Sequence, residues 1–366
     1  MKKNKIKILS CMLVSILLFS ACGVKKDKGV KEKQGEVSQK QEQQSDEKML
    51  LQDKMFFLNS ILTLNIMDED ADKDEIYKKV QERVQELEEK FTINADSSEV
   101  SEINQNAGIR PVKVSKDTYY VIKSSIKYSE LSGGKFDITV GDLVKLWGIG
   151  TDKEKVPSDD EIKSALAKID YRKIVLDDTA QTVFLQDEGM VIDLGAIAKG
   201  YVADEIIKIL EENNIKSAIV NLGGNVYVHG SKNGKDFKVG IRDPFSQDAN
   251  AYFGIYKTQD ESIVTSGVYE RYFIKNGVRY HHILSTSTGY PIDNELMSTT
   301  ILTKNSMVAD ALSTTTFALG VDEGLKLIEN TPNVEAIFVT KDKKVYMTSG
   351  VNEKLELTNK EYEILR

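Results

Sequence analysis

The feature that most limits how this chain can fold is a polar segment at residues 23–48, which carries almost no large apolar side chains. It is rich in Lys, Gln, Glu and Ser. Such a segment cannot bury enough apolar surface to offset the conformational entropy that ordering it would cost. We therefore expect a disordered tether here, and we expect the folded body to occupy residues 50–366.

The segment that precedes the tether has the organisation of an export signal. Several lysines stand among the first seven residues, and an apolar run follows at residues 8–19. The run is too short to cross a bilayer as a helix, but it has the length of a signal-peptide core. Small residues immediately before Cys22 resemble a bacterial lipobox. We predict a signal peptide at 1–21 and a lipidated tether at 22–49 that anchors the protein to the extracytoplasmic face of the cell membrane; a plain secretory signal is the alternative.

Cysteine, histidine and charge content narrow the possible chemistry. The two cysteines, Cys11 and Cys22, both precede the body, and the three histidines are His229, His281 and His282. This set leaves no disulfide in the body and makes a zinc site hard to build, so oxygen ligands of the kind that Mg²⁺ prefers remain. The formal net charge of −8 argues against a nucleic-acid partner.

Hydrophobic periodicity predicts a single α+β domain with a mainly antiparallel sheet and flanking helices. Apolar residues in 74–91 recur every three or four positions, as on one face of a helix. Ser115 has the position of a helix N-cap, and Ser158 with Glu161 has the pattern of a capping box. Further helices are predicted at 197–213, from 306 to Gly320 and from there to Asn330. Short strands are predicted at 55–67, 174–176, 182–185, 191–194, 218–222, 226–228, 336–340 and 345–348. Asn276-Gly277 is predicted to form a hairpin turn.

Short motifs of glycine and polar residues are candidates for a ligand site. They lie at 133–141, 192–201, 221–225, 265–291 and 309–316. The second is a strand, a small-residue turn and a helix start, where free N–H groups and Lys199 suit a phosphate. In the last, Asp310 and Thr314 are four residues apart on one helix face, so that they present a carboxylate and a hydroxyl to a hard cation. Each motif alone is also compatible with an ordinary turn or a surface helix.

The pair His281 and His282 is not a chelating unit. Adjacent residues of a strand face opposite sides, so at most one of the two imidazoles points into a shared site. A single histidine in a site suits proton transfer or a hydrogen bond to a ligand.

The order of these motifs resembles that of the ApbE-type FAD:protein FMN transferases. The resemblance covers roughly residues 55–340 and rests on Gly133 to Gly141, Asp193 to Tyr201, Asn221 to Gly224, Thr265 to Tyr272, His282 to Leu284 and Ala309 to Thr314. The chain departs from the family pattern at Leu58-Asn59-Ser60, at Ala196, where glycine is common, and at Ser285, where aspartate is usual. The resemblance implies an α+β domain that binds FAD.

The resemblance also implies an activity and roles for particular residues. A Ser or Thr hydroxyl of an extracytoplasmic acceptor protein, in a sequence of the type Asp-x-x-Ser/Thr-Gly-Ala-Thr, would attack the FMN-side phosphorus of FAD. A phosphoester to FMN would form and AMP would leave. The implied metal site is Mg²⁺ held by Asp310 and Thr314, with backbone oxygens near Ala196 and Ser313. The implied FAD contacts are Asn94, Lys135, Phe136, Asp137, Asp193, Lys199 and Ile283, and the implied catalytic residues are His282 and Asp310.

Two other functions remain open from the sequence. A Mg²⁺-dependent FAD pyrophosphatase would release FMN and AMP, and it is favoured by asparagine at position 94, because that variant is associated with members that hydrolyse FAD. A non-catalytic flavin-binding lipoprotein is the other alternative; the presence of Lys199, His282, Asp310 and Thr314 argues against it.

Overall fold

The structure is a computed structural model that describes residues 54–58 and 60–365. The predicted signal peptide, the lipidated Cys22, the tether and Asn59 lie outside the described residues. Within the described residues, no helix is both long enough and apolar enough to cross a membrane.

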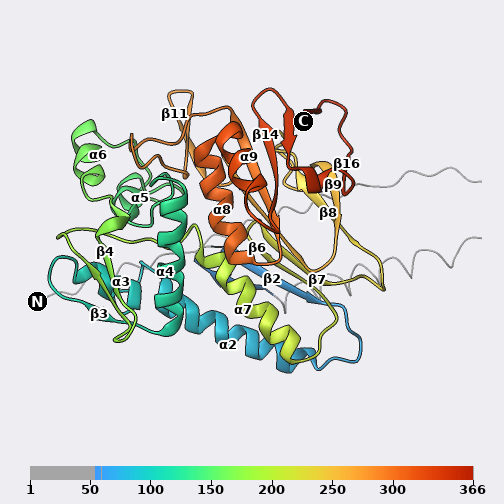
Figure 1. The fold of residues 1–366 in the computed structure, drawn as a ribbon, viewed down its shortest axis with the longest axis horizontal. Coiled ribbons are helices and arrows are strands. Elements are labelled where there is room, and N and C mark those ends of the chain that lie inside the picture. The colour runs from blue at the N-terminus through green and yellow to red at the C-terminus, as the bar shows by residue number, and fades with distance from the viewer. Residues whose placement is uncertain (1–53, 59, 366) are drawn as a thin grey trace, which may run out of the picture. The chain divides into compact units, whose positions relative to one another are not determined.

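The body is organised around a nine-stranded sheet with the order β1-β2-β6-β7-β10-β13-β14-β15-β17 (Figure 1). The neighbouring strands pair antiparallel, except β15 and β17, which are parallel. This confirms the predicted α+β class with mainly antiparallel pairing. The strands are β1 (Lys54–Phe57), β2 (Ser60–Ile66), β6 (Ser217–Leu222), β7 (Asn225–Gly230), β10 (Glu261–Gly267), β13 (Leu296–Thr303), β14 (Glu335–Thr340), β15 (Lys344–Met347) and β17 (Glu363–Leu365).

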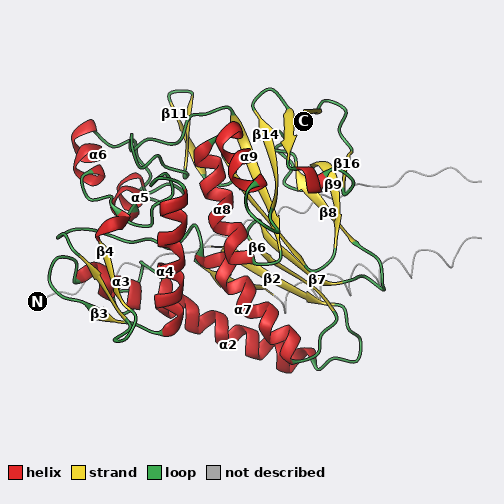
Figure 2. Cartoon of the chain, viewed as in Figure 1, coloured by secondary structure: helices red, strands yellow, loops and turns green. Residues whose placement is uncertain are grey.

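The two faces of this sheet are covered differently (Figure 2). Helices cover one face, with α7 and α8 packed side by side against the central strands. A three-stranded sheet of β16, β9 and β8 packs on the other face through a second apolar cluster. The elements are α2 (Lys73–Phe91), α4 (Lys116–Leu131), α7 (Ala198–Glu212), α8 (Ser306–Leu319), α9 (Val321–Glu329), β8 (Phe237–Arg242), β9 (Tyr252–Thr258) and β16 (Leu355–Leu357).

Smaller elements stand beside one end of these layers. They are α3 (Glu99–Gln105), α5 (Gly141–Trp147), α6 (Asp159–Leu166), a sheet of β3 (Val112–Lys113), β5 (Thr182–Leu185) and β4 (Ile174–Asp177), and the hairpin of β11 (Tyr272–Lys275) and β12 (Val278–His281). The predicted turn of this hairpin is confirmed, since Asn276 and Gly277 have φ values of 52° and 78°.

Helix signals in the sequence agree closely with the observed elements. The apolar stripe predicted in 74–91 is the buried face of α2. Ser115 caps α4, and the Ser158–Glu161 capping box is present at α6. In each case the signal is local, because periodicity and end caps act within one or two turns.

Two strand predictions were wrong. The strand predicted over 55–67 is the hairpin of β1 and β2, which turns through Leu58 at a φ of 43° and pairs Phe57 with Ser60. The segment 191–194 forms only an isolated bridge from Val191 to Val140. The strands predicted at 336–340 and 345–348 are confirmed as β14 and β15, and β16 and β17 follow them.

The segment at 136–139, which follows Gly133-Gly134, is a turn, and side chains explain why. The Asp137 carboxylate accepts a hydrogen bond from the Thr139 N–H at 2.8 Å, and the Asp193 carboxylate accepts one from the Gly195 N–H at 2.7 Å. Such bonds between a side chain and its own backbone compete with strand pairing. The two segments therefore turn sharply where a strand would have continued.

Candidate functional site

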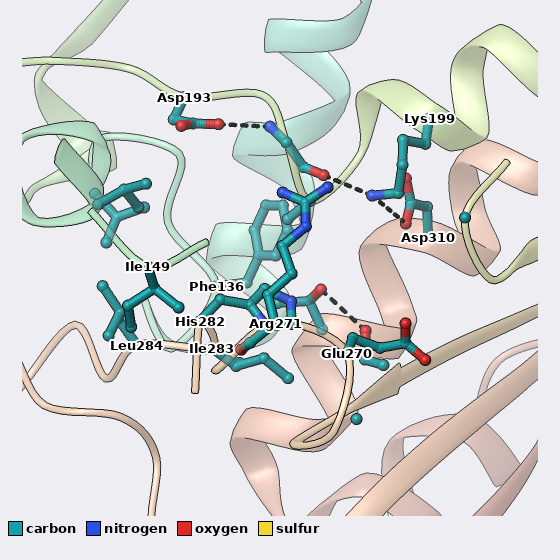
Figure 3. Close-up of a pocket in the computed structure, with 18 of the residues that line it drawn as sticks. Phe136, Ile149, Asp193, Lys199, Glu270, Arg271, His282, Ile283, Leu284 and Asp310 are labelled. Atoms are coloured by element: carbon teal, nitrogen blue, oxygen red, sulfur yellow. Dashed lines mark hydrogen bonds and ion pairs between the residues drawn. The ribbon is translucent and has the colours of Figure 1, made fainter. Parts of the chain in front are cut away.

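A cavity of about 480 Å³ lies where the predicted motifs meet (Figure 3). It has the size and the mixed polar and apolar lining of a small-molecule site. The lining includes Lys135, Phe136, Asp137, Asp193, Ala196, Lys199, Gly223, Asn225, Ser266, Glu270, Arg271, His282, Ile283, Asp310 and Thr314. All five motif regions therefore contribute to one cavity, although they are distant in sequence.

Close contact between α7 and α8 sets the position of Asp310. A Cβ atom at Gly200 would lie 2.3 Å from the Ser306 carbonyl oxygen, so only glycine fits at this crossing. The Gly200 N–H donates to Asp310 Oδ2 at 2.9 Å. From α7, Asp204 accepts hydrogen bonds from the N–H groups of Ser306 and Met307 at 2.7 and 2.9 Å. These bonds hold the start of α8, and burial raises the pKa of Asp204 to about 6.

Asp310 and Thr314 offer the oxygen donors expected of a magnesium site. Asp310 is only 4 % exposed and lies with Thr314 on the cavity side of α8. The Thr314 hydroxyl is 3.4 Å from the Ser266 hydroxyl, which adds a third oxygen. The described residues contain no group of three acidic, histidine or cysteine side chains that could hold a metal. The donor set therefore fits Mg²⁺ whose coordination is completed by ligand phosphates and water, rather than an all-protein cage.

Ser313 faces away from the cavity. It is fully buried, and its hydroxyl donates to the Asp310 carbonyl at 2.8 Å and lies 2.8 Å from the Ser266 hydroxyl. Ala196 lies on the cavity wall. The backbone oxygens predicted near these two residues as metal ligands stay a prediction.

Two cationic side chains reach the cavity. Lys199 Nζ donates to the Gly195 carbonyl at 2.9 Å and lies 3.7 Å from Asp310 Oδ1. Arg271 Nη2 donates to the Ser60 hydroxyl at 3.0 Å, and it makes no ion pair with any residue in the described ranges. A guanidinium that lines a cavity without a carboxylate partner is available to bind an anion.

His282 is held neutral at the cavity wall. Its Nδ1 lies 3.3 Å from the Arg271 carbonyl oxygen. Since a carbonyl only accepts hydrogen bonds, the Nδ1–H form donates there and leaves Nε2 as a proton acceptor. Burial, together with the positive charge of Arg271, lowers the pKa of His282 to about 3. The imidazole is thus unprotonated at neutral pH, so its Nε2 can accept a hydrogen bond or a proton from a ligand.

His281 points away from the cavity, which agrees with the prediction that only one of the two histidines would face a shared site. Its Nε2 lies 3.0 Å from the Ile292 carbonyl, and its ring packs edge-on against Phe317. Burial lowers the pKa of His281 to about 4. This histidine belongs to the packing of the hairpin base.

The two aspartates predicted to contact FAD have different surroundings. Both oxygens of Asp137 are occupied, because Oδ1 accepts from Thr139 and Oδ2 accepts from the Tyr171 N–H at 2.9 Å. The Asp193 carboxylate accepts one hydrogen bond, from the Gly195 N–H, among the described residues, and Asp193 lines the cavity. Burial raises the pKa of both carboxyl groups. Asp137 therefore mainly shapes the turn, whereas Asp193 has an oxygen left for a ligand.

The other residues predicted to contact FAD also differ in whether their side chains can reach a ligand in the cavity. Phe136 and Ile283 are buried side chains of the cavity wall. Lys135 also lines the cavity, but its ammonium is 2.8 Å from Glu323 of α9. Asn94 is exposed in the turn after α2 and is not among the lining residues. Its contact with FAD stays a prediction.

Residues that sequence reasoning left without a role also line the cavity. Asn225 is 1 % exposed; its Oδ1 accepts from the Ser306 hydroxyl at 2.8 Å, but its Nδ2 has no partner among the described residues. Arg271, Ser266 and Glu270 are further polar residues of this kind. Arg271 and Glu270 lie within the motif at 265–291, so the sequence indicated this region as a candidate ligand site. Only the fold shows that these two residues line the cavity.

Comparisons with known proteins agree on one family. A model of the ApbE family matches residues 58–338. The FAD:protein FMN transferase of Klebsiella pneumoniae is 40 % identical over 266 residues, which are 73 % of this chain and 82 % of the relative. That of Treponema pallidum is 36 % identical over 77 % of this chain and 82 % of the relative. The crystal structure of the ApbE protein of Thermotoga maritima superimposes with a TM-score of 0.74 at 32 % identity, covering 82 % of this chain and 97 % of that one.

Proposed function

The chain belongs to the ApbE family, and from this premise we propose that it is an FAD:protein FMN transferase, which moves the FMN half of FAD onto a hydroxyl group of another protein. The observation that carries the proposal is the meeting of three kinds of group in one cavity. Asp310 and Thr314 offer oxygen ligands, Lys199 and Arg271 offer positive charge, and His282 offers a neutral imidazole. Phosphoryl transfer needs this combination of positioning, charge neutralisation and proton transfer.

The pyrophosphate of FAD has a natural place beside Lys199. This lysine is in the first turn of α7, where the positive end of the helix dipole also favours an anion. Arg271 supplies a second cation with no carboxylate of its own. Across the cavity, Gly223 and Gly224 have φ values of 54° and 96° and carry no side chains, so the backbone can approach a large ligand closely.

Asp310 and Thr314 would hold Mg²⁺, which would neutralise negative charge on the phosphates. The protein contributes one carboxylate to this ion, and Lys199 lies near the same carboxylate at 3.7 Å. The positions of Asp310 and Lys199 relative to one another are fixed by the Gly200 contact between their helices. The charge that faces the pyrophosphate is therefore preorganised before FAD binds.

His282 would take the proton of the acceptor hydroxyl. The acceptor oxygen forms a bond to the FMN-side phosphorus, and the bond from this phosphorus to the bridging oxygen breaks. AMP leaves with that oxygen, and the hydroxyl proton passes to Nε2 of His282. The Arg271 carbonyl orients the ring through Nδ1, so the free nitrogen faces the reaction.

We further propose that the protein acts outside the cytoplasm, attached to the membrane by a lipid on Cys22. The support is the sequence alone: a basic and apolar signal, small residues before the cysteine, and a polar tether. A tether of this composition would let the body reach acceptor proteins at the same membrane surface. Mass spectrometry of the mature N-terminus tests this, since an unmodified Cys22 in the membrane-purified protein would contradict it.

The activity is tested by incubating the full chain with FAD and Mg²⁺, with and without a folded domain that carries the sequence Asp-x-x-Ser/Thr-Gly-Ala-Thr. Intact mass and AMP release are followed together. We expect the acceptor to gain one FMN for each AMP released, and chelation of Mg²⁺ to stop both. Free FMN and AMP beside an unmodified acceptor would instead favour the pyrophosphatase, and bound FAD without AMP would favour the flavin-binding protein.

A further inference from the structure

The hairpin of β11 and β12 has an exposed tip beside the cavity, at the upper edge of the view in Figure 1. The hairpin tip, as used below, consists of Ile274, Lys275, Val278 and Arg279. Ile274 is 63 % exposed and Val278 is 51 % exposed, and both cations are exposed as well. The tip therefore offers both apolar and charged contacts to another macromolecule.

The base of the hairpin is firmly packed, in contrast to its tip. Phe273 and Tyr280 stack at 5.2 Å between ring centroids, and Tyr280 packs on the buried Trp147 at 5.5 Å. On the other face, His281 packs against Phe317 of α8. The ladder ends where the His282 N–H donates to the Arg271 carbonyl at 3.1 Å. The tip is thus held in a fixed position relative to the proposed base.

The charge of the hairpin is one-sided. Residues 271–282 include three Lys or Arg side chains and no acidic residue, in a protein whose net charge is −8. Lys275 and Arg279 make no ion pair with any residue that the structure describes; Arg279 instead lies over the Tyr272 ring at 4.4 Å. A cationic surface that the protein leaves without acidic partners is complementary to an acidic partner.

Some backbone hydrogen-bonding groups of the hairpin tip are also available to a partner. Because Arg271 and His282 form a hydrogen-bonded pair, alternation along the ladder directs the N–H and C=O groups of Ile274 and Arg279 outward. The hairpin is a two-stranded sheet without a third strand in the described part of the chain. An extended segment could therefore lie along either edge.

We propose that the hairpin tip is the docking surface for the acceptor protein, and that it binds an extended, acidic segment close to the hydroxyl that receives FMN. This inference rests on the proposed transferase function. Val278 begins β12 and His282 directly follows its last residue, four positions along, about 13 Å at the usual rise of a β-strand. An acidic residue on the tip would therefore stand about three or four positions from a hydroxyl at His282.

The test compares a charge-reversed variant with a matched control. In Lys275→Glu/Arg279→Glu the tip repels an acidic segment. In Lys232→Glu/Lys235→Glu the same charge change is made at another exposed turn, which has the same Asn-Gly geometry at Asn233-Gly234 and does not line the cavity. The full chain is used, loaded with FAD, and the acceptor domain with the sequence Asp-x-x-Ser/Thr-Gly-Ala-Thr is titrated calorimetrically and also assayed for FMN transfer.

We expect the reversed tip to weaken acceptor binding at least tenfold at low salt, while the FAD dissociation constant stays the same in all proteins. The control should bind as the unmodified chain does, and changing the acceptor aspartate to lysine should restore binding to the reversed tip. Equal acceptor affinity for the unmodified and reversed proteins would overturn the docking proposal. Absence of FMN transfer by the unmodified chain, with acceptor binding still sensitive to the tip, would count against the transferase function and leave the docking surface standing.

Discussion

Two clusters of charged residues in this protein differ in whether their charges are paired with one another. Between α2, α4 and α7, Arg83 lies 2.6 Å from Asp117 and 2.7 Å from Glu205, and Lys90 lies 2.7 Å from Asp117. At the cavity, Arg271 has no carboxylate partner in the described residues, and the contact of Lys199 with Asp310 is long, at 3.7 Å. The first cluster satisfies its charges internally, whereas the second leaves them for a ligand.

The difference shows how structural and functional charges can be told apart. Burial opposes ionisation of Asp117, but hydrogen bonds from Arg83 and Lys90 outweigh it and hold the pKa of Asp117 below its ordinary value. His282 has no such compensation, because burial and a neighbouring cation both lower its pKa, to about 3. Groups whose environment disfavours their charge, gathered at a cavity, mark a functional site.

The largest expected effect is that of Asp310→Asn. The amide keeps the shape of the side chain and can still accept from the Gly200 N–H, but it removes the only carboxylate of the proposed metal site. We expect FMN transfer to fall by about 10³-fold with little change in thermal stability. AMP release measures FMN transfer, and a melting curve measures thermal stability. A variant that transfers FMN at the normal rate would remove the basis of the metal assignment.

Asp117→Asn should show the reverse pattern. The change removes one carboxylate that Arg83 and Lys90 share, but both still contact Glu86, so we expect the free energy of unfolding to fall by about 2 kcal/mol. Urea denaturation measures this loss. Below the melting temperature, FAD affinity should stay the same. If this variant is as stable as the unmodified chain, the ion pairs of Asp117 do not stabilise the fold. The cluster around Arg83 could then not be contrasted with the cavity cluster as a structural one.

His282→Ala tests the chemistry of the cavity without touching its metal side. We expect kcat for FMN transfer to fall by about 10²-fold, the usual contribution of a general base, while the dissociation constant of FAD changes little. Single-turnover rates and FAD fluorescence separate the two quantities. A loss confined to FAD affinity would instead make His282 a residue that orients the ligand.

Arg271→Gln should weaken FAD binding about tenfold, because one charged hydrogen bond to a phosphate is lost. The matched control is Arg279→Gln, since that arginine belongs to the hairpin tip and does not line the cavity. Fluorescence titration with FAD compares the two variants. Equal FAD affinities would mean that Arg271 holds the hairpin to Ser60 rather than holding the ligand.

The smallest effect is a pH dependence of stability. The pKa values of His281 and His282 lie at about 4 and about 3 in the folded protein, below the ordinary value of 6.5. Between these values the unfolded chain binds more protons at the two histidines, which lowers the free energy of unfolding as the pH drops from 7 toward 6. Asp204, whose pKa is raised to about 6, binds more protons in the folded chain and offsets part of this loss at lower pH. From pH 7 to pH 6 the loss is less than about 1 kcal/mol per histidine. Urea denaturation at several pH values checks the sign, and a rise in stability on acidification would contradict it.

The sequence predicted features that are set within a few residues. The stripe of α2 and the capping box of Ser158 could be read directly, because helix signals depend on neighbours along the chain. The hairpin of β1 and β2 was missed, because alternation does not reveal a tight turn at Leu58. The turn at Asp137 was missed for a related reason: its side chain replaces strand bonds with bonds to its own backbone.

The site residues that could be predicted from the sequence are those that lie in recognisable motifs. Asp310, Thr314, Lys199 and His282 were named from sequence, and the structure brings them to one cavity. Asn225 and Arg271 were given no role, because nothing local tells whether a polar residue on a strand or beside a hairpin faces a ligand. That information comes from the order of β7, β10 and β13 in the sheet, which is set by long-range pairing.

The crossing of α7 and α8 at Gly200 has a consequence for movement. Because the backbones touch there without an intervening side chain, the two helices cannot slide past one another, and Lys199 and Asp310 travel as one rigid body. We therefore expect any opening that admits FAD or releases AMP to come from the turn that carries Phe136, because the hairpin base beside His282 is packed on Phe317 of α8. Lys199 and Asp310 would then keep their spacing while the ligand enters and leaves.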